Sequence, residues 1–291
     1  MRRKARACSR NWGRLTSWPA MAESSPSEVA ARQRTAADGL SIVDPSARIA
    51  PSATIGPWCL VGPNTVIGPD TRLLQNVVVA SNTILGSRNE IHSFTVLGGA
   101  PQTRERDATP GSLLIGDDNV IREHVTVNLG SSLSERITSI GNGNLVMAGC
   151  HLGHDASVGA HCILASGTVL AGHVFIHDFA RLGGNVAVAE WVRIGAYAFV
   201  GGQSGVDRDV PPFCVTYGVR PTTLRGCNLR ALRKRFDVDA VRTIASIVRV
   251  WMDRTRSRRD AANRIADDYG DHPAAKAFLE FVRESRVGVL R

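Results

Sequence analysis

The chain carries one aliphatic residue at every sixth position over two long stretches, and this spacing constrains its fold more than any other feature. The first stretch runs without exception from Val43 to Leu97, and the same phase returns between Ile115 and Val127. A second stretch, shifted by one residue, runs from Ile140 to Val206. Neither an α-helix, with its period of 3.6, nor a single strand, with its period of two, keeps a six-residue spacing for so long. A solenoid of short strands does.

In such a solenoid each hexad forms one side of a triangular coil and points its aliphatic residue inwards, with a small residue beside it at the corner. Aromatic residues make up only 5% of the chain, which suits a narrow core of Val, Ile and Leu. Adjacent coils pair as parallel strands about 4.8 Å apart, so residues 18 positions apart stack on one another. The sequence therefore predicts a left-handed parallel β-helix over residues 39–221. Segments 99–114 and 129–139 break the phase, and we expect loops there.

Beyond Pro221 a helical pattern replaces the six-residue spacing. Apolar residues from Val238 to Trp251 recur three and four positions apart. We expect helices over residues 228–236, 237–254, 258–268 and 273–286. Asp237 and Asp260 are the expected N-caps, and Gly270 the expected stop signal. The fold class is thus mainly β, with residues 222–291 forming an α-helical domain that caps the last coil and covers its open sheet edge.

Positive charge is concentrated at the two ends of the chain. The net charge is +9, and residues 222–291 hold 16 Lys and Arg against 9 acids, whereas residues 39–221 hold 11 against 14. No zinc knuckle, winged-helix pattern or RNA-binding signature accompanies these basic ends, so we expect no nucleic-acid partner. An acidic protein or a phosphorylated small molecule explains the basic helical domain at least as well.

Residues 1–38 show neither the repeat nor a helical pattern, and we expect a disordered N-terminal extension. Its Arg-rich, acid-poor beginning is also typical of an organellar transit peptide, and Met21 is an alternative initiator. No run approaches 18 apolar residues, so we expect no membrane span. The six cysteines form no C-x-x-C pair, which indicates reduced thiols in a cytoplasmic protein.

Histidines gather where the repeat does not require them. Counting by the 18-residue coil, His154 stacks beneath Gly172, which stacks beneath Glu190, and Asp155 stacks beneath His173. An imidazole beside a carboxylate is the arrangement that orients a general base. A glycine N–H one coil away can receive a developing oxyanion. We interpret this group, together with the nearby His151, as a catalytic site rather than as solvated surface.

Several segments of the chain resemble one known family. They are "IGPWCLVGPNTVIG", "GDDNVIREHVTVNLG", "GNGNLVMAGCHLGHDASVG", "LAGHV", "VGGQSGVDRDVPP" and "GCNLRALRKRF". Together they resemble the bacterial acyl-ACP:UDP-N-acetylglucosamine O-acyltransferases, which open lipid A synthesis, over roughly residues 40–291. The H-x-x-H-D segment, the positions of the two loops and the helical C-terminus make this resemblance more specific than the repeat alone.

The resemblance implies a role for each matching residue. His154 is expected to be the catalytic base, Asp155 the carboxylate that orients it, and Gly172 the oxyanion-binding glycine. The expected substrate-binding residues are His151, His173, Glu190, Gly202, Asn228, Lys234 and Arg235. Gly202 corresponds to the position that limits acyl-chain length, and Asn228 and Arg235 to nucleotide contacts. The implied partners are an acyl carrier protein as (3-hydroxy)acyl donor and UDP-N-acetylglucosamine, acylated at its 3-position by a homotrimer that needs no metal or other cofactor.

The chain also departs from the family pattern. The pair Ala189-Glu190 stands where His-Gln is usual, and Thr103 and Glu105 replace an acid and a lysine that handle the acceptor. Arg230 replaces an acid, and Lys234 replaces an arginine, losing the bidentate fork. Since the added carboxylates repel a diphosphate, we expect UDP-N-acetylglucosamine to be accepted with a raised Michaelis constant.

Three alternatives remain open at this stage. One is an N-acyltransferase acting on a UDP-3-amino-sugar, or another sugar acyltransferase. The second is a zinc protein of the carbonic-anhydrase type, in which three histidines bind the metal across a subunit interface, although with a different spacing. The third is a binding paralogue that has lost activity.

Overall fold

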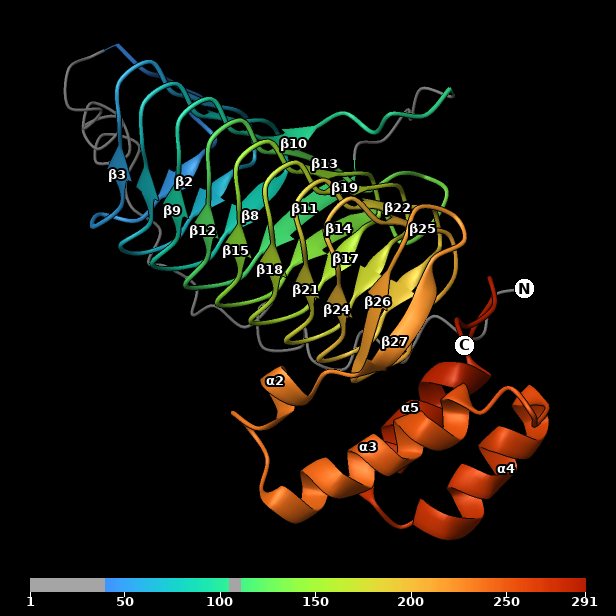
Figure 1. The fold of residues 1–291 in the computed structure, drawn as a ribbon. Helices are drawn as coiled ribbons and strands as arrows, with labels where there is room; N and C mark the ends of the chain where they lie inside the picture. The colour runs from blue at the N-terminus through green and yellow to red at the C-terminus, as the bar shows by residue number, and fades with distance from the viewer. Residues whose placement is uncertain (1–39, 105–110) are drawn as a thin grey trace.

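The computed structural model describes residues 40–104 and 111–291, and it shows a triangular tube of short strands with helices at one end (Figure 1). This is the left-handed parallel β-helix that the six-residue spacing predicts. The extension expected over residues 1–38 lies outside the described residues, as does Glu105 in the first predicted loop.

The strands form three sheets, A, B and C, one along each side of the tube. Sheet A contains β1 (Ile42–Val43), β4 (Leu60–Val61), β7 (Val78–Val79), β10 (Val96–Gly99), β13 (Thr126–Asn128), β16 (His151–Leu152), β19 (Val169–Leu170), β22 (Ala187–Val188) and β25 (Gly205–Val206). Sheet B contains β2 (Arg48–Ile49), β5 (Val66–Ile67), β8 (Thr83–Leu85), β11 (Ser112–Ile115), β14 (Ile137–Ile140), β17 (Ser157–Val158), β20 (Phe175–Ile176) and β23 (Arg193–Ile194). Sheet C contains β3 (Thr54–Ile55), β6 (Arg72–Leu73), β9 (Glu90–Ile91), β12 (Val120–Ile121), β15 (Leu145–Val146), β18 (Ile163–Leu164), β21 (Arg181–Leu182), β24 (Phe199–Val200), β26 (Cys214–Tyr217) and β27 (Thr223–Cys227).

The aliphatic residue of each hexad fills the tube. From Ile55 to Val206 every residue of the predicted column is buried, and Val43 and Ile49 at the open end are partly buried. The pairing register is 18 residues between most neighbouring coils outside the two loops, as in His151 opposite Val169. The last coil is shorter, and Phe199 pairs with Val215 at an offset of 16 residues. The prediction of one inward residue per side is therefore confirmed.

Most turns between two sheets place one residue in the left-handed region of backbone space. We call the three lines of turns corner AB, corner BC and corner CA, after the sheets that they join. Asp155 (φ 59°) and His173 (φ 58°) occupy this position at corner AB. Asn, Asp and His tolerate this conformation best among residues with a side chain. The bulky Trp191 (φ 65°) adopts it as well, and its ring stacks on the ring one coil below.

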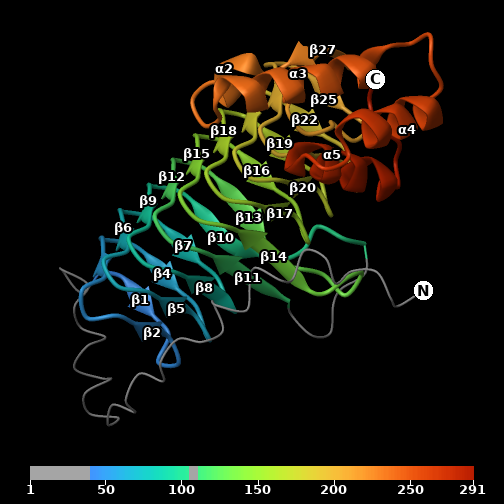
Figure 2. The same cartoon turned by 90° about the horizontal axis from the view of Figure 1, so that it is seen from below.

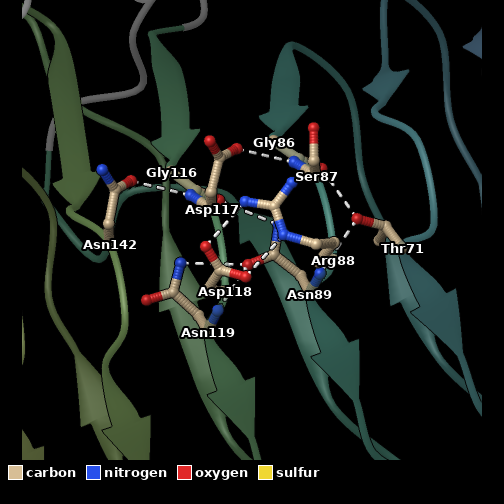
Figure 3. Close-up of polar contacts among 10 residues, drawn as sticks. All are labelled: Thr71, Gly86, Ser87, Arg88, Asn89, Gly116, Asp117, Asp118, Asn119 and Asn142. Atoms are coloured by element: carbon tan, nitrogen blue, oxygen red, sulfur yellow. Dashed lines mark hydrogen bonds and ion pairs between the residues drawn. The ribbon is translucent and has the colours of Figure 1, made fainter.

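A ladder of buried asparagines runs inside corner BC. The side-chain oxygen of Asn89 accepts from the N–H of Asn119 at 3.0 Å, and that of Asn119 accepts from the N–H of Asn144 at 2.9 Å. Figure 3 shows Asn89 and Asn119 of this ladder together with the nearby Arg88–Asp118 ion pair, whose side chains are exposed. Because each amide pairs with a backbone group of the next coil, the ladder satisfies turn donors that the tube would otherwise bury unpaired.

The helices follow the last strands and lie against the C-terminal end of the tube (Figure 2). They are α2 (Leu229–Leu232), α3 (Val238–Met252), α4 (Arg258–Tyr269) and α5 (Pro273–Arg283). Asp237 caps α3 and Gly270 ends α4 as predicted, but Asp260 is not an N-cap. Ser257 caps α4 instead, because its hydroxyl accepts from the N–H of Asp260 while donating to the Asp260 carboxylate.

The chain end is tied to the last coil. Asp209 donates its N–H to Gly288 and accepts from the N–H of Leu290, both at 2.9 Å, and the Trp251 indole donates to the carbonyl of Leu290. This tail extends sheet B, while β27 pairs antiparallel with β26 and extends sheet C. The open sheet edges are thus covered by backbone pairing as well as by the predicted helices.

Candidate functional site

Corner AB carries the predicted catalytic cluster. His154 and Asp155 lie in the turn between β16 and β17, and Gly172 and His173 lie in the turn one coil above. Both breaks in the repeat open at this same corner, because the chain leaves sheet A after β10 and after β13 and returns to sheet B at β11 and β14. Loops that gather at one corner of a rigid tube are typical of a functional site.

His154 and Asp155 form the expected pair. The Nδ1 atom of His154 lies 2.8 Å from Oδ2 of Asp155, and both side chains are buried. The pKa of Asp155 is raised by burial, but hydrogen bonds from Ser131, Ser134 and His154 outweigh this effect and leave it below its ordinary value. The carboxylate is therefore ionised at neutral pH and accepts the Nδ1 proton, which leaves Nε2 of His154 as the free basic nitrogen.

Gly172 lies directly against the His154 ring. A Cβ atom at this position would be 2.6 Å from Cε1 and 2.7 Å from Nε2 of His154. These distances are too short for any residue with a side chain, so the position requires glycine. The Gly172 N–H has no acceptor among the residues that the structure describes. Glycine thus has two uses here, since it makes room for the imidazole and presents a free donor beside its Nε2.

The cluster extends along the corner through stacked rings. His173 meets His154 edge to face, with ring centroids 5.1 Å apart, and lies parallel to Trp191 at 3.9 Å. The Arg286 guanidinium lies 5.7 Å from the Trp191 centroid, so the tail of the helical domain reaches the top of this stack. His151, on the outer face of β16, contacts the Thr126 hydroxyl through Nδ1 at 2.8 Å. Burial lowers the pKa of His151.

Acidification is expected to weaken the fold, because buried histidines lie at corner AB and at corner BC. Burial is the main cause that lowers the pKa of His173, and it also lowers the pKa of His177 below the ordinary 6.5. Groups with a lowered folded-state pKa contribute stability that is complete above about pH 6.5 and is lost as the pH falls through the folded pKa. Urea unfolding between about pH 8 and pH 5 should show a falling free energy, and His173→Gln should flatten part of the slope. A flat wild-type profile would contradict this.

The other predicted binding residues lie at different corners. Gly202 is exposed at corner CA, in the turn after β24. Asn228 lies at corner BC, where its Nδ2 donates to the Tyr197 carbonyl at 2.8 Å and its Oδ1 caps α2. Arg235 lies over the Phe179 ring at the same corner, and Lys234 beside it is exposed. One chain therefore does not bring all the predicted residues into one site.

The structure describes two of the three altered positions Thr103, Glu105 and Glu190. Glu190 is exposed at corner AB, and its charge acts on His173. Thr103 is half-buried at the start of the first loop, and Glu105 lies outside the described residues.

The histidine cluster is not well suited to a metal ion. Ligand atoms of His154, Asp155 and His173 all lie within 4.8 Å of one another. Each Asp155 oxygen, however, already accepts two hydrogen bonds from protein donors, so its lone pairs are engaged. Two histidines and an occupied carboxylate differ from the three-histidine zinc site considered above.

Sequence reasoning missed three groups at this corner. Ser131 and Ser134, from the loop between β13 and β14, both donate to Asp155, and the Thr138 hydroxyl accepts the Asp155 N–H at 2.8 Å. The loop breaks the 18-residue register, so counting could not place its serines beside Asp155.

Comparisons with known proteins agree with one another. The family model described as "Udp N-acetylglucosamine O-acyltransferase; Domain 2" matches residues 209–290, and the bacterial transferase hexapeptide model matches residues 137–172. A Syntrophobacter fumaroxidans protein named acyl-[acyl-carrier-protein]--UDP-N-acetylglucosamine O-acyltransferase is 38% identical over 217 residues, which cover 74% of this chain and 84% of that protein.

Solved structures give the same result. The UDP-N-acetylglucosamine acyltransferase of Francisella novicida superimposes with a TM-score of 0.84 at 33% identity, covering 87% of this chain and 92% of that one. The Arabidopsis UDP-N-acetylglucosamine acyltransferase superimposes with a TM-score of 0.79 at 29% identity, covering 87% and 99%.

Proposed function

This chain belongs to the acyl-[acyl-carrier-protein]–UDP-N-acetylglucosamine O-acyltransferase family, and on that premise we propose how its own residues carry out the transfer. The protein is an acyltransferase that uses acyl-ACP and UDP-N-acetylglucosamine in the first step of lipid A biosynthesis. The observation that carries the residue assignment is the buried His154–Asp155 pair beneath a glycine with a free N–H.

The proposed reaction is a direct transfer of a (3-hydroxy)acyl group. Nε2 of His154 removes the proton from the sugar 3-hydroxyl, and the oxygen attacks the thioester carbonyl. The Gly172 N–H stabilises the tetrahedral oxyanion. As the intermediate collapses, the C–S bond breaks and His154 returns its proton to the leaving thiolate. Asp155 holds the Nδ1 proton and stabilises the imidazolium in between.

We further propose a homotrimer in which the site lies between subunits. The distribution of Gly202, Asn228 and Arg235 over two other corners supports this, since a neighbouring copy can bring its own corner towards His154. The outer face of sheet A also exposes Ile42, Leu60 and Val169. Exposed apolar side chains along one face of a rigid tube favour an interaction surface there.

Light scattering is therefore expected to give three times the 31.2 kDa of the chain at assay concentration. Leu60→Arg should shift the distribution towards smaller species and reduce activity in parallel. Ile84→Arg, at an equally exposed position of β8 in sheet B, should change neither. A wild-type monomer that is fully active would refute the intersubunit site.

We propose a separate role for each of the two domains. Residues 39–221 would form the acyltransferase domain, and the basic residues 222–291 would bind the acidic acyl carrier protein as well as the nucleotide. We propose a cytoplasmic location because the cysteines of the described residues are free thiols. No helix of the described residues is long and apolar enough to cross a bilayer.

The test is incubation of the protein with a panel of acyl-ACPs and UDP-sugars, with products identified by mass spectrometry. An O-acylated UDP-N-acetylglucosamine is the expected product. Glu190 favours a second candidate, because an exposed carboxylate at corner AB can pair with an amine. A panel in which only the 3-amino analogue is acylated would establish N-acylation instead, and acyl transfer to no sugar would refute both.

A further inference from the structure

The Asp155 carboxylate is held mainly by an insertion loop rather than by the solenoid. Its Oδ1 accepts from the Ser131 N–H at 3.0 Å and from the Ser134 hydroxyl at 2.7 Å. Its Oδ2 accepts from the Ser131 hydroxyl at 2.5 Å and from His154 Nδ1 at 2.8 Å. Three of these four donors belong to the loop of residues 129–136 between β13 and β14, so both oxygens are fixed in direction.

The loop is itself built to hold this position. A Cβ atom at Gly130 would be 2.0 Å from the carbonyl carbon of Arg136, so the two ends of the loop are pressed together at its base. Ser131 is fully buried, and its hydroxyl also accepts from the Leu133 N–H at 3.2 Å. The Ser131 hydroxyl is therefore oriented by its neighbours and its proton is directed at Oδ2.

We propose that Ser131 and Ser134 are positioning residues for acyl transfer, which fix the Asp155 carboxylate so that it holds the Nδ1 proton of His154. This proposal rests on the proposed function, because it assigns His154 as the base. With the serines in place, Oδ2 cannot turn away from Nδ1, and Nε2 keeps its direction towards the acceptor hydroxyl. Misplacement of a reacting group by about 1 Å costs on the order of 10²-fold in rate.

The two serines also help to keep the Asp155 carboxylate ionised. Their hydroxyls act against burial to hold the pKa of Asp155 low. The other titratable groups facing Asp155 are His154 and His173, the latter with Nε2 at 3.8 Å from Oδ2, while Glu190 acts on His173 from outside. Loss of a serine hydroxyl should therefore raise the pKa of Asp155 and move the acid limb of the pH–rate profile upwards.

The test compares Ser131→Ala and Ser134→Ala with wild type under saturating substrates. Loss of a hydrogen bond to a charged group corresponds to a factor of roughly 10 to 100 in rate. Each variant should therefore lose about that factor in kcat, with little change in KM. The acid limb of kcat should shift upwards, and Ser134→Thr, which keeps a hydroxyl, should restore both. Ser134 lies in an exposed stretch, so Ser134→Ala decides the question even if Ser131→Ala does not fold.

Ser46→Ala is the matched control. Ser46 donates to Asp44 at 2.7 Å, the same chemistry at an exposed turn of the first coil, and its loss should leave kcat and the acid limb unchanged. The proposal is overturned if the two alanine variants behave like Ser46→Ala, or if kcat falls without any shift of the acid limb.

A second measurement does not depend on turnover. The Nδ1 proton of His154, hydrogen-bonded to Asp155, should give a low-field proton NMR signal that His154→Ala abolishes. Ser131→Ala and Ser134→Ala should move or broaden this signal. If wild type acylates no sugar but the signal responds, the function is wrong and the positioning role stands. An unchanged signal in both serine variants would overturn the positioning role.

Discussion

Replacing His154 by alanine should lower kcat by a factor on the order of 10²–10⁴, the usual contribution of a positioned general base. No other imidazole among the described residues combines an ionised carboxylate on one nitrogen with a free glycine N–H beside the other. Asp155→Asn should lose less, because the base remains while its orientation and charge support weaken. The measurement is kcat with saturating acyl-ACP and UDP-N-acetylglucosamine.

The control for His154→Ala is His272→Asn. His272 caps α5 through its ring nitrogen, and asparagine keeps a capping acceptor while removing the imidazole. This variant should keep wild-type kcat. If His154→Ala also keeps it under saturation, the base has been assigned to the wrong residue.

The second large effect is expected from Gly172→Ala. Alanine keeps the backbone N–H, so the oxyanion donor survives, but its methyl group would lie 2.6 Å from Cε1 of His154 and push the ring aside. Since the neighbour is a buried ring tied to Asp155, a loss of on the order of 10²-fold in kcat is expected. The variant should still fold, because Gly172 does not have a positive φ.

Gly205→Ala separates a steric effect at the base from a general cost of adding a methyl group. The Cβ at Gly205 would meet only ordinary contact, 3.8 Å from Cγ of Arg220. Its kcat and melting temperature should stay close to wild type. If Gly172→Ala is as active as Gly205→Ala, the close contact between Gly172 and the His154 ring has no catalytic importance.

The repeat predicts most of the fold because every hexad has to meet the same structural requirement. One aliphatic residue must face inwards on every side of the coil, so the phase alone determines the strands and the 18-residue register. The same register places His154 beneath Gly172 and Asp155 beneath His173 from the sequence alone. The left-handed turn positions follow the same count.

What the sequence could not predict lies where the count is interrupted. Ser131 and Ser134 come from a loop of arbitrary length, whose path depends on packing at Gly130 rather than on periodicity. The sequence predicts only the oxyanion-binding role of Gly172, because the steric demand of the His154 ring becomes visible only in three dimensions. Counting hexads does place Gly202 at a different corner from His154, and this consequence of the repeat was available from the sequence.

Because the coils are stacked, the distance between the catalytic pair and the helical domain can change only by whole coils. From His173 the chain of contacts rises one coil to Trp191 and then meets Arg286 from the tail. Strands pair only with their counterparts in adjacent coils, so this interval changes in whole coils of about 4.8 Å and cannot be adjusted continuously. Removing one 18-residue coil above His173 would bring the Arg286 cation directly over that imidazole, whereas adding one would withdraw it. Gain or loss of a whole coil can thus change the charge above the reactive histidines without any change in the His154–Asp155 pair itself.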